Sequence, residues 1–205
     1  WFRSYHKNNN EIGYIDAKSG NVILTESRFD NSSYTGIFET RYSGTQQGTT
    51  EFYNNTYNLA DYSRSAIIRT RNNRNNSNIN NAIEITDANN YWSSAEYSSS
   101  NLDMGLDIHW TLQKIYDHLN LSYNKNSFDN AGFHINAYVK YADGNDDRDN
   151  AYWDRVDSVL LFGEGYSIVK PMASIDIVGH EFGHGITFFQ IGWSNIGDQK
   201  ALNEG

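Results

Sequence analysis

The sequence of 205 residues contains no cysteine, few basic residues and no long apolar run. Without cysteine, disulfide bonds and thiol chemistry are excluded, so any cross-link must come from a metal ion. Lysine and arginine number 16 against 25 aspartates and glutamates. This acidic balance argues against nucleic acid as a partner, because a phosphate backbone requires clustered positive charge.

No apolar run approaches the roughly 18 residues of a membrane span, and residues 1–10 lack the apolar centre of a signal peptide. We therefore expect a soluble protein without a membrane span and with any export signal already absent.

Aromatic residues are abundant in the chain. They make up 15% of it and include fifteen tyrosines, a composition that favours strands and amphipathic surfaces over a purely aliphatic core. A chain of this length fits one domain, or one domain with an appendage. The composition predicts a mixed α and β domain.

The N-terminal half is patterned as strands. Residues 11–27 hold two strand-like runs around a Lys-Ser-Gly-Asn turn, a hairpin signature with Gly20 available for a positive φ. Several short strand-like runs follow between residues 36 and 72, which predicts an antiparallel sheet. Residues 72–81, NNRNNSNINN, predict a solvated loop. The one internal boundary that we expect lies near residues 30–36.

The C-terminal half predicts two helices. Apolar residues recur at intervals of three and four from Leu102 to Leu119, and strand-like runs follow around residues 134–142, 150–153 and 158–165. Ser174 can cap a second helix that extends to about residue 190. Together the elements predict an α+β fold with a twisted antiparallel sheet, a long helix and a second helix that carries the motif described next.

The motif H-E-x-x-H occupies residues 180–184. On a helix, His180 and His184 lie one turn apart and point the same way, so both imidazoles can bind one zinc ion. Glu181 is offset by about 100°, which places its carboxylate beside the metal, where it can take a proton from bound water. The alternative, two ordinary half-buried histidines, is weakened because this motif occurs by chance in about one chain in a hundred of this size.

Two features of the motif helix and its surroundings need an explanation. Gly183 and Gly185 each cost about 1 kcal/mol relative to alanine in a helix interior, and close packing against a neighbouring element could compensate. Catalytic zinc takes three protein ligands, and the acidic candidates downstream are Asp198 and Glu204. Glu204 follows Lys-Ala-Leu-Asn, which is typical of a helix start. A further helix, packed across the motif helix, could therefore bring the Glu204 carboxylate to the metal.

Residues 176–187, DIVGHEFGHGIT, followed by ALNEG at the end of the chain, resemble the thermolysin-like neutral metalloproteases. The signature of that family is H-E-x-x-H with a later Asn-Glu pair, and the 24-residue spacing from the first histidine to that glutamate also matches. The resemblance implies a secreted zinc endopeptidase that hydrolyses peptide or protein substrates. It implies three zinc ligands, His180, His184 and Glu204, and Glu181 as the catalytic base.

Other segments extend the resemblance. Asn150-Ala151-Tyr152-Trp153 is similar to the family's N-A-F-W edge strand, which makes Asn150 and Ala151 candidate substrate contacts; ordinary hairpin residues are the alternative. Asp176 matches an aspartate that binds structural calcium in many relatives, although a first-turn charge on the helix would explain it equally. Residues 12–23 look like the tail of a propeptide. The resemblance thus divides the chain into a propeptide tail with a β-hairpin, residues 1–33, and the N-terminal lobe of the catalytic domain, residues 34–205.

The departures from the family leave alternatives open. A second, mostly helical lobe that stabilises the charge on the substrate carbonyl is absent from this sequence, and residues 191–200 lack the tyrosine that is common there. The chain could therefore bind zinc and yet be catalytically incomplete without the C-terminal lobe. A non-enzymatic interaction module, suggested by the excess of tyrosine and asparagine, is the second alternative.

Overall fold

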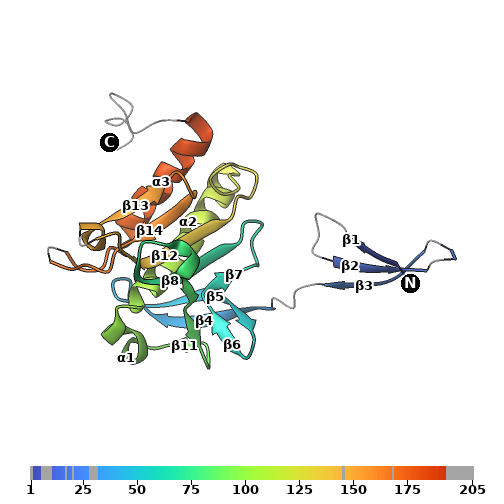
Figure 1. The fold of residues 1–205 in the computed structure, drawn as a ribbon, viewed down its shortest axis with the longest axis horizontal. Coiled ribbons are helices and arrows are strands. Elements are labelled where there is room, and N and C mark those ends of the chain that lie inside the picture. Colours follow the sequence, from blue (N-terminus) through green and yellow to red (C-terminus); the bar gives the residue numbers. More distant parts are fainter. Residues whose placement is uncertain are drawn as a thin grey trace. The chain divides into compact units, whose positions relative to one another are not determined.

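The chain divides into two compact units, Trp1–Ser32 and Ser33–Gly205 (Figure 1). The computed structural model describes residues 2–5, 11–16, 18–19, 21–27, 32–144, 146–167 and 169–192. The first unit is an antiparallel sheet in the order β1-β2-β3, made of β1 (Phe2–Tyr5), β2 (Glu11–Ile15) and β3 (Val22–Ser27). The hairpin predicted within residues 11–27 is thus confirmed, although Gly20 lies outside the described residues.

The second unit begins with a five-stranded sheet. It contains β4 (Ser32–Glu39), β5 (Thr45–Tyr53), β6 (Thr56–Asn58), β10 (Thr86–Asp87) and β11 (Tyr91–Trp92), in the order β10-β6-β5-β4-β11. The β5–β6 turn is formed by Asn54 and Asn55, whose φ angles of 51° and 66° are left-handed, a conformation that asparagine tolerates in hairpin turns.

A six-stranded sheet forms the other half of this unit. It contains β7 (Ala60–Asp61), β8 (Ile68–Asn76), β9 (Ile83–Glu84), β12 (Ile135–Tyr141), β13 (Ala151–Asp154) and β14 (Val159–Phe162). The order is β13-β14-β12-β8-β7, with β9 paired to β8. The prediction of an antiparallel sheet is wrong for part of each sheet, because β12 runs parallel to both β8 and β14, and β11 runs parallel to β4 in the five-stranded sheet. A parallel pair needs a long crossover, and the segment between β8 and β12, which includes a long helix, supplies it.

The described residues contain three α-helices: α1 (Ser94–Tyr97), α2 (Asp103–Tyr123) and α3 (Ile175–Ile191). Short 3-10 turns occur at Ile79–Asn81, Ser98–Ser100 and Asp146–Asp149. The two predicted helices are confirmed as α2 and α3, and the α+β class with them. Helix α2 packs against β5, β8 and β12, whereas α3 packs against α2 and β13. None of the helices in the described part of the chain is long and apolar enough to cross a membrane.

The asparagine-rich stretch, residues 72–81, differs from its prediction. Strand β8 continues to Asn76, with Asn72 opposite Val139 and Asn76 opposite Tyr141. Asn73 is fully buried, and its side-chain amide donates to the carbonyl oxygen of Asn76. Only the remainder of the stretch lies outside a strand. The pairing with β12 stabilises strand structure where composition alone favours a loop.

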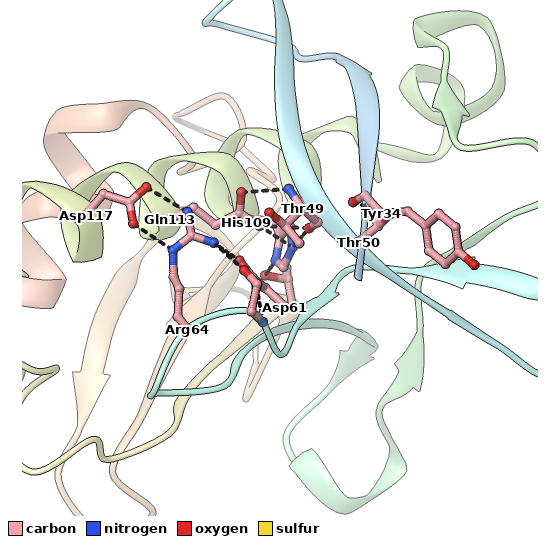
Figure 2. A network of polar contacts seen from close by, with 10 residues as sticks. Tyr34, Thr49, Thr50, Asp61, Arg64, His109, Gln113 and Asp117 are labelled. Carbon is pink, nitrogen blue, oxygen red and sulfur yellow. Dashed lines mark hydrogen bonds and ion pairs between the residues drawn. The ribbon is translucent and has the colours of Figure 1, made fainter. Parts of the chain in front are cut away.

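Helix α2 carries a buried polar network between the two sheets (Figure 2). Nε2 of His109 lies 2.9 Å from the carbonyl oxygen of Thr49 in β5. The side-chain amide nitrogen of Gln113 lies 3.0 Å from the same Nε2, and the hydroxyl oxygen of Thr70 in β8 lies 3.2 Å from Nδ1. Arg64 bridges two carboxylates of the same region, those of Asp61 and Asp117. The network ties α2 to one strand of each sheet.

Candidate metal centre

Helix α3 brings the two motif histidines together. Buried Val178 and Phe182 hold its inner side in the core, so the remaining side is open to carry polar groups. His180 is exposed and His184 is half-buried. Their Nε2 atoms lie 2.9 Å apart and their rings are nearly perpendicular, at 81°. Two imidazole nitrogens thus converge on one point beside the helix.

Glu181 lies next to this pair but is buried, with 6% of its surface exposed. Its Oε2 accepts a hydrogen bond of 2.9 Å from the backbone N–H of Trp153 in β13. That N–H is available because Gly163 donates to the carbonyl of Asn150 across the β13–β14 pair, which turns residue 153 away from β14. The carboxylate is therefore fixed by a neighbouring strand as well as by its own helix.

These three side chains can hold a metal. His180, Glu181 and His184 each offer a ligand atom, all within 4.8 Å of one another, and no other group of three or more acidic or histidine ligands occurs among the described residues. Two imidazoles and nearby carboxylates are a donor set that zinc accepts. Glu204 and its competitor Asp198 lie outside the described residues.

A profile of the family described as thermolysin metallopeptidase, catalytic domain, matches residues 35–188. The chain belongs to this family. It is 30% identical to Bacillolysin of Brevibacillus brevis over 191 residues, covering 93% of this chain and 34% of that protein. It is also 30% identical to Neutral protease B of Bacillus subtilis (strain 168), covering 93% of this chain and 35% of that protein. The chain thus spans about a third of the length of these relatives.

A solved structure shares the fold of this thermolysin-family chain. It is the precursor of protealysin, a metalloproteinase from Serratia proteamaculans, with a TM-score of 0.53 and 24% identity. The match covers 68% of this chain and 40% of that one. The α+β arrangement predicted as a thermolysin-like N-terminal lobe is therefore confirmed.

The two glycines of the thermolysin-family motif differ in their surroundings. A Cβ added at Gly185 would lie 2.6 Å from two ring carbons of Phe128 and 3.2 Å from Trp153. At Gly183 nothing lies within 4 Å. Close packing thus compensates for the glycine at position 185, as expected, whereas nothing in the structure explains the glycine at position 183.

Of the predicted substrate residues, Ala151 begins β13 and Asn150 directly precedes it; β13 is an edge strand of the six-stranded sheet. The carbonyl oxygen of Asn150 accepts from Gly163 at 2.8 Å, so only the exposed side chain of this residue is available to a ligand. The side chain of Ala151 is buried. Because successive residues of a strand direct their backbone groups to opposite sides, the N–H and carbonyl of Ala151 point away from β14, whereas the carbonyl of Asn150 points towards it. In the described part of the chain no strand pairs with this edge.

Asp176 lies exposed in the first turn of α3. The Ser174 hydroxyl beside it and the backbone N–H groups of the helix start hold the pKa of its carboxyl below the ordinary value. Among the described residues it belongs to no group of three or more potential metal ligands. The contacts therefore agree with a charge at a helix N-terminus, and calcium at this position stays a prediction.

The contact between Glu181 and Trp153 was not visible in the sequence. The donor is a backbone N–H that lies 28 positions before the acceptor in the sequence. Every residue type except proline carries such an N–H, so the residue type at position 153 does not indicate the contact. The likeness of residues 150–153 to the family's edge strand is the one signal that could have indicated it.

Proposed function

We propose that this chain forms the zinc-binding lobe of an endopeptidase that hydrolyses peptide bonds with Glu181 as general base. The observation that carries the proposal is the arrangement on one turn of α3: two convergent imidazoles and, beside them, a buried carboxylate held by the Trp153 N–H at 2.9 Å. Membership of the thermolysin family supports the same reaction.

Three residues would hold the zinc ion: His180, His184 and Glu204. The first two supply neutral imidazole nitrogens from one helix face. Glu204 is proposed from the family signature and from its spacing alone. When bound, zinc lowers the pKa of a water ligand towards 7 and polarises a peptide carbonyl.

Glu181 would move the proton in this reaction. Its carboxylate takes a proton from the attacking water and later gives it to the leaving amine. The hydrogen bond from Trp153 fixes Oε2 of this carboxylate beside the two imidazoles. Burial of the side chain limits the orientations that it can adopt.

The edge of β13 would bind the substrate. An extended peptide can add to an open strand edge through backbone hydrogen bonds. Ala151 would supply its outward N–H and carbonyl groups, and Asn150 its side-chain amide. The same strand that orients Glu181 would then align the scissile bond.

A cleavage assay tests the proposal. Purified chain is incubated with a peptide substrate, with and without added zinc, beside the Glu181→Ala variant. In a catalytically competent protein we expect zinc-dependent cleavage that Glu181→Ala abolishes while zinc stays bound. Retained proteolysis in that variant would overturn the role of Glu181.

One observation favours a second candidate, a zinc-binding but catalytically incomplete fragment: the chain spans about a third of the length of its relatives. Stoichiometric zinc without cleavage would identify it, and the C-terminal lobe would then be the missing partner. Absence of zinc would instead favour the non-enzymatic interaction module.

We further propose that residues 1–33 are the tail of a propeptide and that the protease is secreted as a zymogen. The separation of a first compact unit, Trp1–Ser32, supports such a tail. Deleting residues 1–33 should leave zinc binding by the second unit intact. Secretion would be contradicted if the protein were detected only inside the cells and not in the surrounding medium.

A further inference from the structure

The ring of Phe128 occupies the position that a side chain at Gly185 would need. A Cβ on Gly185 would come within 2.6 Å of both Cδ1 and Cε1 of Phe128, and within 3.2 Å of Cε3 of Trp153. Carbon atoms in contact lie at about 3.5 to 4.0 Å. Either the ring or the helix must therefore move if position 185 carries any side chain.

Phe128 has little room to move. It is 1% exposed, and its ring centroid lies 4.4 Å from that of Phe182 and 4.8 Å from that of Trp153. Its carbonyl oxygen accepts a 3.0 Å hydrogen bond from the side-chain amide of Gln190, near the end of α3. The loop that carries Phe128 is thus tied to the same helix, and displacement of α3 is the response that remains.

Displacement of α3 would reach Glu181. Residues 181 and 185 are one helical turn apart and face the same way, and both face Trp153. Moving the helix by about 0.8 Å, enough to relieve the contact with Phe128, would lengthen the 2.9 Å bond to Trp153 beyond the roughly 3.5 Å at which a hydrogen bond is lost.

We propose that Gly185 and Phe128 are positioning residues that set the distance between α3 and β13 and thereby hold Glu181 on the Trp153 amide. The catalytic meaning of this spacing rests on the proposed function, in which Glu181 is the general base. The spacing itself is a property of the packing and can be measured without catalysis.

Amide hydrogen exchange at Trp153 measures the contact directly, because this N–H donates to Glu181 and faces away from β14. The experiment uses the 205-residue chain loaded with zinc and followed by NMR. We expect Gly185→Ala to raise the exchange rate of the Trp153 amide at least tenfold, towards the rate in Glu181→Ala. The matched control is Gly183→Ala on the same helix, where nothing lies within 4 Å, and its rate should equal that of the wild type.

A smaller residue at position 128 should restore the contact. In the double variant Phe128→Leu/Gly185→Ala, we expect the exchange rate to return to within about threefold of the wild type. An unchanged rate in Gly185→Ala, an equal rise in Gly183→Ala or the absence of this rescue would each overturn the proposal. If Gly185→Ala does not fold, the double variant decides: wild-type exchange supports the proposal, and the rate of Glu181→Ala overturns it.

Zinc content and cleavage, measured on the same variants, separate this proposal from the proposed function. Where wild-type protein cleaves peptide, Gly185→Ala should lower kcat with little change in KM and retain zinc, and Phe128→Leu should restore kcat. If the wild type shows neither zinc nor cleavage, the proposed function fails, while the exchange rates still decide the spacing.

Discussion

The Nε2 atoms of His180 and His184 lie 2.9 Å apart on α3, close enough that one imidazole donates to the other or that both bind one ion. The pair lies at the surface end of the site, whereas Glu181 between them in the sequence is buried. This separation gives the proposed metal ligands access to solvent and keeps the proposed base in a fixed, enclosed position.

The third zinc ligand can be distinguished by two substitutions. We expect Glu204→Ala to weaken zinc binding by about a hundredfold, because losing one of three protein ligands leaves two imidazoles on one helix. Asp198→Ala, the matched control among the acidic residues downstream, should change the dissociation constant less than threefold. Competition titration with a chromophoric chelator measures both, and the opposite order would move the ligand to Asp198.

The buried histidine of α2 predicts a loss of stability in acid. Burial lowers the pKa of His109 to about 4, against the attraction of the nearby Asp61 carboxylate, while Arg64 lowers it further. In the unfolded chain the pKa of His109 is near 6.5, so between about pH 6.5 and pH 4 the unfolded chain binds a proton that the folded protein does not bind. The contribution of neutral His109 to the unfolding free energy is therefore fully present above pH 6.5. It is lost as the pH falls towards 4, and the loss amounts to roughly 3 kcal/mol.

Urea unfolding between pH 7 and pH 4 checks this expectation. His109→Gln should flatten the dependence of the unfolding free energy on pH, because glutamine does not titrate. His118→Gln replaces an exposed histidine of the same helix and should leave the slope as in the wild type. Equal slopes in wild type and His109→Gln would show that His109 is not the acid-sensitive group.

The Arg64 network predicts that loss of the arginine costs more than loss of its exposed partner Asp117. The Asp61 side chain is fully buried and that of Asp117 is 39% exposed. Arg64→Met leaves the Asp61 charge without its cation and should cost about 3 kcal/mol or more, whereas Asp117→Asn should cost at most about 1 kcal/mol. Thermal unfolding compares them, and equal losses would contradict the importance of burial.

The two glycines of the motif also predict opposite changes in stability. Gly183→Ala should raise the unfolding free energy by up to about 1 kcal/mol, since alanine is the better helix former and the position is open. Gly185→Ala should lower it by about 1 to 3 kcal/mol through overpacking against Phe128. Chemical unfolding at pH 7 measures both, and stabilisation by Gly185→Ala would mean that the ring yields easily.

The helices could be predicted closely because their evidence is local. The three- and four-residue recurrence of apolar positions predicted α2 from residue 102 to 119, and the helix spans Asp103–Tyr123. Helix α3 begins one residue after the serine proposed as its cap, although the Ser174 side chain makes no cap hydrogen bond.

The sheets were harder to predict because strand direction depends on partners far away in the sequence. Nothing local in β12 indicates that β8, 67 positions away, is its parallel neighbour. Asn73 likewise reads as part of a loop, and only its pairing and burial within the sheet place it in a strand.

The parts of the site that depend on side-chain identity and helical spacing could be predicted from the sequence. The parts that depend on packing between distant segments could not. His180, Glu181 and His184 are fixed by helical geometry, so their convergence followed from spacing. The contact of Phe128 with Gly185 joins a loop to a helix more than fifty residues later, and no periodicity in the sequence reports it.

Zinc content is the measurement that tests the central claim most directly. Purified chain is dialysed against a small excess of zinc and then analysed for metal, beside the variants His184→Ala and Glu181→Gln. We predict one zinc ion per chain in the wild type and in Glu181→Gln, and loss of that ion in His184→Ala. Absence of zinc from the wild type, or its retention in His184→Ala, would contradict the account.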